Sequence, residues 1–178
     1  MKGREITVNV KPYMYQYAVM SFGTDTIPLR RGRTLTKVII PHLVLVSEGE
    51  AEQPAKEGYM QLKFELPAWS LTCEPGTDRK MYCYPLFRNR ITEEGEASVR
   101  RFLANTFKNS FRVYMDAYIE RQEETKTEEK KNMIKSGVVS FLMKYHIDVD
   151  ERLVTSLTRD WYRHNEDNEQ YKFSPMLY

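Results

Sequence analysis

Residues 141–164 read FLMKYHIDVDERLVTSLTRDWYRH, and this stretch holds the end of one amphipathic helix, an acidic turn and a second helix. Apolar residues recur at helical spacing on both sides of the turn, which is Asp148-Val149-Asp150. Asp150 is a good N-cap for the second helix, and Val149 can pack against Val154 across that cap. The stretch therefore predicts two helices joined by a three-residue turn.

The helix before the turn has an apolar stripe at the i, i+4, i+7, i+8 and i+11 positions. Either Thr125 or Thr127 can cap its start, and we expect it to stop at His146-Ile147. The stripe consists of Ile134, Val138, Phe141, Leu142 and Tyr145.

The helix after the turn, from about Glu151 to His164, has two contrasting faces when each residue advances by 100°. Its apolar face consists of Leu153, Val154, Leu157 and Trp161. Its polar face consists of Arg152, Thr155, Ser156, Arg159 and Arg163. Arginine can contact guanine edges or phosphates through two parallel hydrogen bonds, and a helix of this length fits a major groove. This pattern is typical of a helix-turn-helix and favours double-stranded DNA as the partner.

A second interpretation of the same helices needs no nucleic acid. Arginine and serine on the outer face of an amphipathic helix are the ordinary way to keep that face solvated. Helical hairpins that only pack or bind proteins are common, and this turn lacks the glycine that many helix-turn-helix motifs use. A protein–protein interaction or structural module, with a homodimer as one form, therefore stays open beside a DNA-binding or regulatory protein.

A longer helix precedes the pair. Thr92 can cap it, and three glutamates in its first turn, Glu93, Glu94 and Glu96, complement the positive end of the helix dipole. We expect residues 120–132, which are almost all polar, to form a solvated connection or an exposed extension of helix. Its broad apolar face is predicted to hold Val99, Phe102, Leu103, Thr106, Phe107, Phe111, Val113, Tyr114, Ala117 and Tyr118, opposite Arg101, Asn105, Lys108, Arg112 and Asp116.

The N-terminal half reads as a mixture of short strands and helices. We expect strands at 6–10, 27–29 and 59–66, an exposed loop at 47–58, and irregular chain at 67–89 with a turn at Pro75-Gly76 and an edge strand within 81–87. Two segments are ambiguous between helix and strand, and for both we favour helix: 13–22, between Pro12 and Gly23, and 35–43, capped by Thr34. The fold class is therefore α+β, with a mixed α/β part at 1–90 and a three-helix part at 91–178 that together form one compact unit.

Charge limits how this chain could bind nucleic acid. The formal net charge is +2, and residues 91–178 carry 14 basic against 16 acidic side chains. DNA binding would therefore depend on a local stripe of arginines rather than on the overall field. A second basic cluster, Arg30, Arg31 and Arg33 around Gly32, could contact phosphates from a loop, although a short basic loop is usually only solvated.

Other classes of protein find little support. The longest apolar run, 38–46, is too short for a membrane span, and the N-terminus has no signal-peptide pattern, so we expect a cytoplasmic protein without membrane contact. Cys73 and Cys83 read as free thiols. The three histidines, His42, His146 and His164, lack ligand spacing, and no phosphate loop or nucleophile motif is present. We therefore expect no metal, no small-molecule cofactor and no enzymatic activity.

The last 80 or so residues resemble small uncharacterised proteins of phages and mobile elements of anaerobic gut bacteria. The resemblance rests on the aromatic-rich pattern from Phe141 to Arg163: FLxKYxI, an acidic turn, a leucine-rich helix and YR. It brings no established activity. It implies a mobile-element setting, in which DNA-binding accessory and regulatory proteins are frequent.

Overall fold

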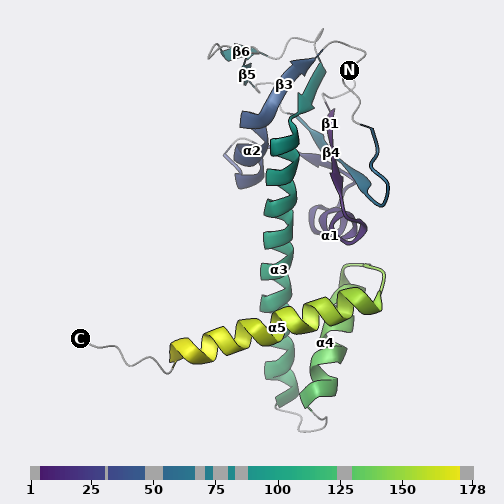
Figure 1. Cartoon of the computed structure of the whole chain (residues 1–178), viewed down its shortest axis with the longest axis vertical. Helices are drawn as coiled ribbons and strands as arrows, with labels where there is room; N and C mark the ends of the chain where they lie inside the picture. The colour runs from purple at the N-terminus through teal and green to yellow at the C-terminus, as the bar shows by residue number, and fades with distance from the viewer. Residues whose placement is uncertain are drawn as a thin grey trace, which may run out of the picture. The chain divides into compact units, whose positions relative to one another are not determined.

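The computed structural model describes residues 5–30, 32–46, 54–66, 71–73, 80–82, 88–123 and 130–172, and it has an α+β fold. Short strands and helices precede residue 92, and long helices follow it (Figure 1). The chain forms two compact units, Met1–Phe107 and Lys108–Tyr178. The longest helix, α3 (Glu93–Glu123), contributes residues to both units, so the change of unit falls within a helix.

A three-stranded sheet is the centre of the first unit. Its order is β1 (Glu5–Val10), β4 (Met60–Glu65) and β2 (Thr26–Pro28), with β1 antiparallel and β2 parallel to β4. The period-2 pattern of the sequence points alternate residues to one face of such a sheet. The strands predicted at 6–10, 27–29 and 59–66 are thus confirmed, and the buried face of the sheet holds Ile6, Val8, Ile27, Leu62 and Phe64.

The first ambiguous segment is a helix, α1 (Pro12–Phe22), as predicted. Pro12 occupies the first turn, where its missing N–H costs no hydrogen bond. Gly23 ends the helix in the left-handed region, at φ 70°, and donates its N–H to the carbonyl of Val19. The Pro-first, Gly-last pattern therefore outweighed the alternation of Tyr13, Tyr15 and Tyr17, which would also fit a strand.

The second ambiguous segment divides into helix and strand. The helix α2 (Thr34–Ile39) is followed by a 3₁₀ turn at Ile40–His42 and by strand β3 (Leu43–Val46). The prediction of a helix to residue 43 was therefore too long, because Pro41 lacks the N–H that would continue it. Thr34 was also the wrong cap, since it is the first helical residue and Arg33 takes the N-cap position.

Two further strand pairs lie in the segment that the sequence left largely irregular. β7 (Arg88–Ile91) pairs antiparallel with β3, and β5 (Leu71–Cys73) pairs antiparallel with β6 (Lys80–Tyr82). The edge strand expected within 81–87 overlaps β6 at two residues, and the rest of it lies outside the described residues, as does the turn at Pro75-Gly76. β7, with its two arginines, has no apolar alternation, so only its partner β3 identifies it as a strand.

A buried carboxylate links α3 to β1 in the first unit. Glu96 is 1% exposed, and its Oε1 accepts hydrogen bonds from the backbone N–H and the Nδ2 of Asn9, both at 3.2 Å. Its Oε2 lies 3.0 Å from Arg100 Nη1 and 3.5 Å from Lys56 Nζ. Burial alone raises the pKa of Glu96, but these hydrogen bonds and cations outweigh it, so the net pKa lies below its ordinary value. Glu96 is thus a structural anion rather than only a dipole-complementing residue.

The second unit is a three-helix core made by the later part of α3 with α4 (Lys130–Lys144) and α5 (Glu151–Lys172). Phe111 is central, because it meets Phe141 edge to face with ring centroids 5.2 Å apart and Trp161 at 6.5 Å. The caps expected at Thr125 or Thr127 lie outside the described residues. Three predictions for α3 were wrong: Val113 is 70% exposed, Ala117 is exposed, and Met115, which was left out of the apolar face, is fully buried.

Candidate nucleic-acid interface

The predicted helix pair is present, and a left-handed residue follows the end of α4. His146 has φ 52° and donates its N–H to the carbonyl of Met143 at 3.1 Å. The N–H of Ile147 reaches the carbonyl of Leu142 at 2.9 Å, and the side chains of both residues are buried. These two bonds satisfy carbonyls that a helix end otherwise leaves open. Histidine therefore takes the place in which glycine is commonest, so the missing glycine did not prevent the turn.

Asp150 caps α5, as predicted. Its Oδ1 accepts a hydrogen bond from the N–H of Arg152 at 3.3 Å, and its carbonyl accepts one from Val154 at 2.9 Å. Val149, expected to cover the cap, is 51% exposed. Because α4 ends at Lys144 and α5 begins at Glu151, the connection covers residues 145–150 and is longer than the three-residue turn that was expected.

The two faces of α5 differ in burial in the way that the sequence predicts. On the apolar face, Val154, Leu157 and Trp161 are at most 5% exposed, and Leu153 is partly buried. On the polar face, all five residues are exposed: Arg152, Thr155, Ser156, Arg159 and Arg163. We call these five residues the arginine face. It is held outward because the opposite side of the helix is packed into the three-helix core.

One acidic residue next to the arginine face, Asp160, is already paired. Asp160 lies between Lys108 Nζ at 3.3 Å and Arg112 Nη2 at 3.2 Å, both on α3. Within the described residues, no ion pair involves Arg152, Arg159 or Arg163. The carboxylate that could have neutralised the arginine face thus joins α5 to α3 instead.

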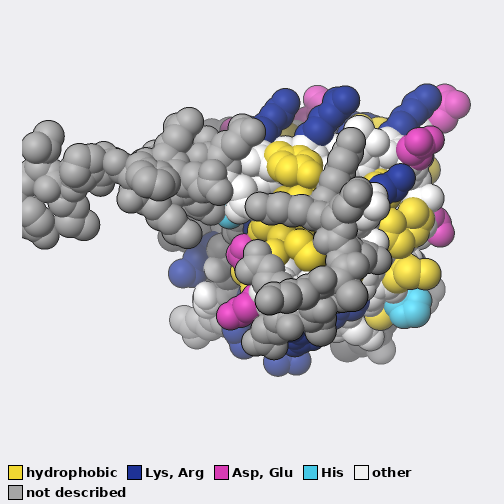
Figure 2. Space-filling model, turned by 90° about the horizontal axis from the view of Figure 1, so that it is seen from below, with side chains coloured by type: hydrophobic (Ala, Val, Ile, Leu, Met, Phe, Trp, Pro, Cys, Tyr) yellow, Lys and Arg dark blue, Asp and Glu magenta, His cyan; other side chains and the backbone are white. Residues whose placement is uncertain are grey.

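The start of α5 is acidic, in contrast to the arginine face. Asp148, Asp150 and Glu151 are all exposed around its first turn. Figure 2 shows one face of the molecule, where Lys and Arg side chains stand along the upper edge with Asp and Glu side chains beside them. An anion would therefore be attracted to the side of α5 rather than to its N-terminal tip.

The second basic cluster belongs to the other unit. Arg30 and Arg33 are exposed on either side of Gly32, which has φ 79°, and Arg31 lies outside the described residues. The carbonyl of Arg30 accepts a hydrogen bond from Thr36 Oγ1 at 2.8 Å, which fixes the loop against α2. Arg30 and Arg33 thus form an exposed basic pair on a loop of the first unit.

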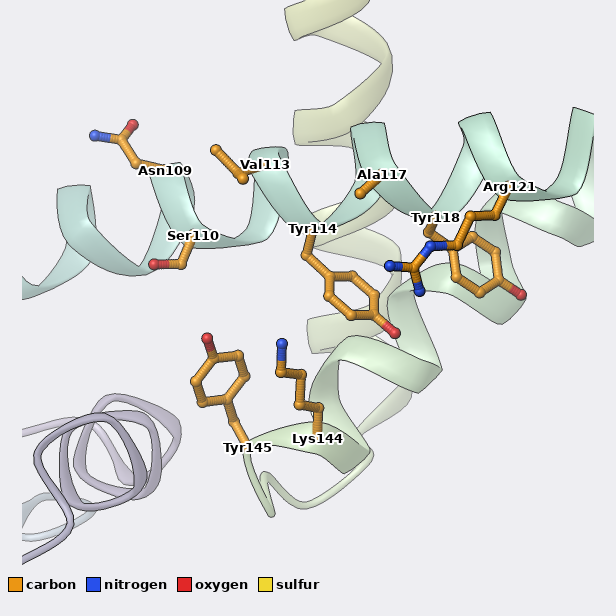
Figure 3. Close-up of a pocket in the computed structure, with 9 residues that line it drawn as sticks. All are labelled: Asn109, Ser110, Val113, Tyr114, Ala117, Tyr118, Arg121, Lys144 and Tyr145. Atoms are coloured by element: carbon orange, nitrogen blue, oxygen red, sulfur yellow. The ribbon is translucent and has the colours of Figure 1, made fainter.

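A groove that the sequence did not predict lies between α3 and the end of α4, with a volume of about 510 Å³. Figure 3 shows Tyr114, Lys144 and Tyr145 pointing into the same space. The sequence had assigned Tyr114, Tyr118 and Tyr145 to apolar core faces, because ring spacing on a helix does not distinguish a core position from the wall of a groove. Its lining residues are Asn109, Ser110, Val113, Tyr114, Ala117, Tyr118, Arg121, Lys144 and Tyr145.

The described part of the chain offers no group of three or more His, Cys, Asp or Glu residues placed to hold a metal ion. None of its described helices has the length and apolar character needed to cross a membrane. The fold and these surfaces define an α+β protein with an outward arginine face on a helical hairpin. No family model matches the chain, and no match was found among curated proteins or among solved structures.

Proposed function

We propose that this protein binds double-stranded DNA through the arginine face of α5. The observation that carries the proposal is the exposure of three arginines and two hydroxyl residues on one side of a helix whose other side is buried. Arginine forms paired hydrogen bonds with phosphates and guanine, and serine and threonine contact phosphates and bases. The pairing of Asp160 with Lys108 and Arg112 supports it further, because the carboxylate that follows Arg159 in the chain is engaged with α3.

The spacing of the face fits contact along the side of the helix. From Arg152 to Arg163 the helix rises by about 16 Å, at about 1.5 Å per residue. The acidic first turn disfavours insertion of the helix tip, so phosphate contacts dominate and sequence discrimination is modest. Release of counterions by three arginines gives a slope of log affinity against log salt of about −2.7.

The setting that we propose is a non-enzymatic accessory or regulatory protein of a phage or mobile element, acting in the cytoplasm. This part rests on the resemblance of residues 141–163 to such proteins and on the absence of a catalytic motif in the sequence. Its partner would be duplex DNA, without metal or cofactor. Arg30, Arg31 and Arg33 would add phosphate contacts from the first unit.

Fluorescence anisotropy with a labelled mixed-sequence duplex, at several salt concentrations, tests the proposal. We expect salt-sensitive binding by the unaltered chain and a loss of at least tenfold in the double variant Arg159→Gln/Arg163→Gln, with a salt slope that is shallower by about 2. Arg101→Gln is the matched control, since Arg101 is exposed on α3 and lies off the arginine face. Absence of binding at low salt, or equal binding by the double variant, contradicts the proposal.

A second candidate function is protein interaction, and exposed hydrophobic side chains favour it. Val113 on α3 is 70% exposed and Met143 on α4 is 66% exposed. Such residues can form the centre of a contact with another protein or with a second copy of the chain. Light scattering and a pulldown compare the two functions. A monomer that binds duplex DNA with strong salt dependence and captures no protein rules this candidate out.

A further inference from the structure

The groove between α3 and the end of α4 has features of a ligand site that are independent of the arginine face. Its volume of about 510 Å³ lies within the range of ligand pockets, which is about 300–1,000 Å³. Among the residues that the structure describes, those lining the groove come from α3, from the end of α4 and from Tyr145, and none comes from α5. A ligand could therefore occupy the groove while the arginine face is either free or bound to DNA.

A lysine held by aromatic rings gives the groove its charge. The Lys144 ammonium lies 5.2 Å from the ring centroid of Tyr114 and 5.7 Å from that of Tyr145 (Figure 3). These are cation–π distances, so the rings hold the ammonium in place without cancelling its charge. Its described lining residues include no Asp or Glu, and Arg121 adds a second cationic side chain to its wall. The groove is thus suited to an anion.

The tyrosine rings are fixed before any ligand arrives. The hydroxyls of Tyr114 and Ser140 share a hydrogen bond of 2.7 Å, and Tyr114 stacks on Tyr118 with centroids 6.2 Å apart and planes 23° apart. Tyr145 packs against Phe141 at 4.9 Å. Tyr118 lies so close to α4 that a Cβ placed on Gly137 would be 2.8 Å from its ring. Rings that are already ordered lose little entropy when a planar group binds against them.

We propose that this groove binds a nucleoside phosphate, either as a free nucleotide or as a unit of single-stranded nucleic acid. The phosphate would meet the Lys144 ammonium, and the base would lie against the tyrosine rings, an arrangement in which stacking contributes without reading sequence. Asn109 and Ser110 also line the groove and carry hydrogen-bonding groups that could contact the sugar or the base edge. A ligand with only a charge or only a ring would use half of the site.

Calorimetric titration of the full chain with four probes tests this inference: adenosine monophosphate, adenosine, inorganic phosphate and a ten-residue oligodeoxythymidine. We expect adenosine monophosphate or the oligonucleotide to bind at least tenfold more tightly than adenosine or phosphate. Tighter binding of the oligonucleotide than of the nucleotide identifies single strands as the source, and the reverse identifies free nucleotides. No binding of either at millimolar concentration overturns the inference.

Variants separate the groove from the arginine face. Lys144→Gln should weaken nucleotide binding at least tenfold, and Tyr145→Leu should weaken it while leaving the charge in place. Lys135→Gln is the matched control, because Lys135 is exposed on α4 and does not line the groove. Arg159→Gln/Arg163→Gln should lose duplex binding and keep nucleotide binding, so the two proposals can fail separately. An unchanged affinity in Lys144→Gln, or equally tight binding of a polyglutamate peptide, overturns the inference.

Discussion

Two groups of charged residues in this protein differ in what surrounds them. In the first unit, Glu96 is buried and meets Arg100 at 3.0 Å and Lys56 at 3.5 Å, so its charge is used within the fold. On α5, Arg152, Arg159 and Arg163 are exposed, and no ion pair of the described residues involves them. A charge with partners thus stabilises the fold, whereas a charge left in solvent is available for binding. Substitution of Glu96 should therefore lower stability and leave DNA binding unchanged. Substitution of the α5 arginines should weaken DNA binding and leave stability unchanged.

The largest effect is expected for Glu96→Gln. A neutral amide cannot balance Arg100 and Lys56, and loss of one member of a buried network costs about 2–4 kcal/mol, reduced here because Lys56 is partly exposed. Urea unfolding followed by circular dichroism measures the loss. Duplex binding below the unfolding transition should not change. Equal stability of Glu96→Gln and the unaltered chain contradicts a structural role for this carboxylate.

Low pH should reduce the stability that the Glu96 carboxylate contributes. The pKa of Glu96 is lower in the folded chain than its ordinary value of 4.5, so the unfolded chain takes up the proton first. The stabilisation is therefore present above pH 4.5 and is lost as the pH falls through the lowered pKa. Melting temperatures from pH 7 to pH 3 measure this loss. Glu96→Gln should show a shallower decline than the unaltered chain, and parallel declines speak against the assignment.

Asp160→Asn tests a paired carboxylate beside the arginine face. Removing the charge weakens its links to Lys108 and Arg112, and we expect a loss of about 1 kcal/mol, because these cations are partly exposed and screened by solvent. The net charge rises by one, so duplex binding should strengthen by a few-fold at low salt. Unfolding and anisotropy measurements on the same preparation check both effects. Weaker duplex binding would indicate that Asp160 helps to place the arginine face.

The smallest effect on stability is expected for Arg152→Gln. An exposed side chain outside any ion pair of the described residues typically changes stability by no more than about 0.5 kcal/mol. Removing a cation from the first turn of a helix also relieves repulsion with the helix dipole. Thermal melting should therefore show no loss, while anisotropy shows weaker duplex binding. A marked loss of stability would place Arg152 in the fold rather than at an interface.

Much of the helical part was predictable because its signals are local. The caps at Thr92 and Asp150 hold, since Thr92 Oγ1 accepts a hydrogen bond from the N–H of Gly95 at 3.1 Å and Asp150 caps α5. The division of α5 into buried and exposed faces also holds. The exposure of Val113 and the burial of Met115 did not follow from the apolar spacing of the sequence. α3 contributes to two units, and the elements that pack against it in each unit determine which side is buried.

The sheet was predictable only in part. Polar and apolar residues alternate strictly along β1 and along β4, so each strand could be recognised without its partner. β7 and the division of residues 34–46 into helix and strand depend on pairing between β3 and β7, which are far apart in the chain. Such pairings depend on closing a long loop, and no short stretch of sequence of the kind used to predict strands contains both β3 and β7.

The sequence by itself determined the helix pair, its cap and the outward arginines, because periodicity and capping act over a few residues. Which charges have partners depends on how the helices and strands pack. Asp160 reaches across to α3, Glu96 accepts from Asn9, and Lys144 comes to lie over Tyr114, all through contacts between residues far apart in the chain. The arginine face could thus be predicted from the sequence. The pairing of Asp160 with α3 and the groove beside Lys144 depend on how the helices pack.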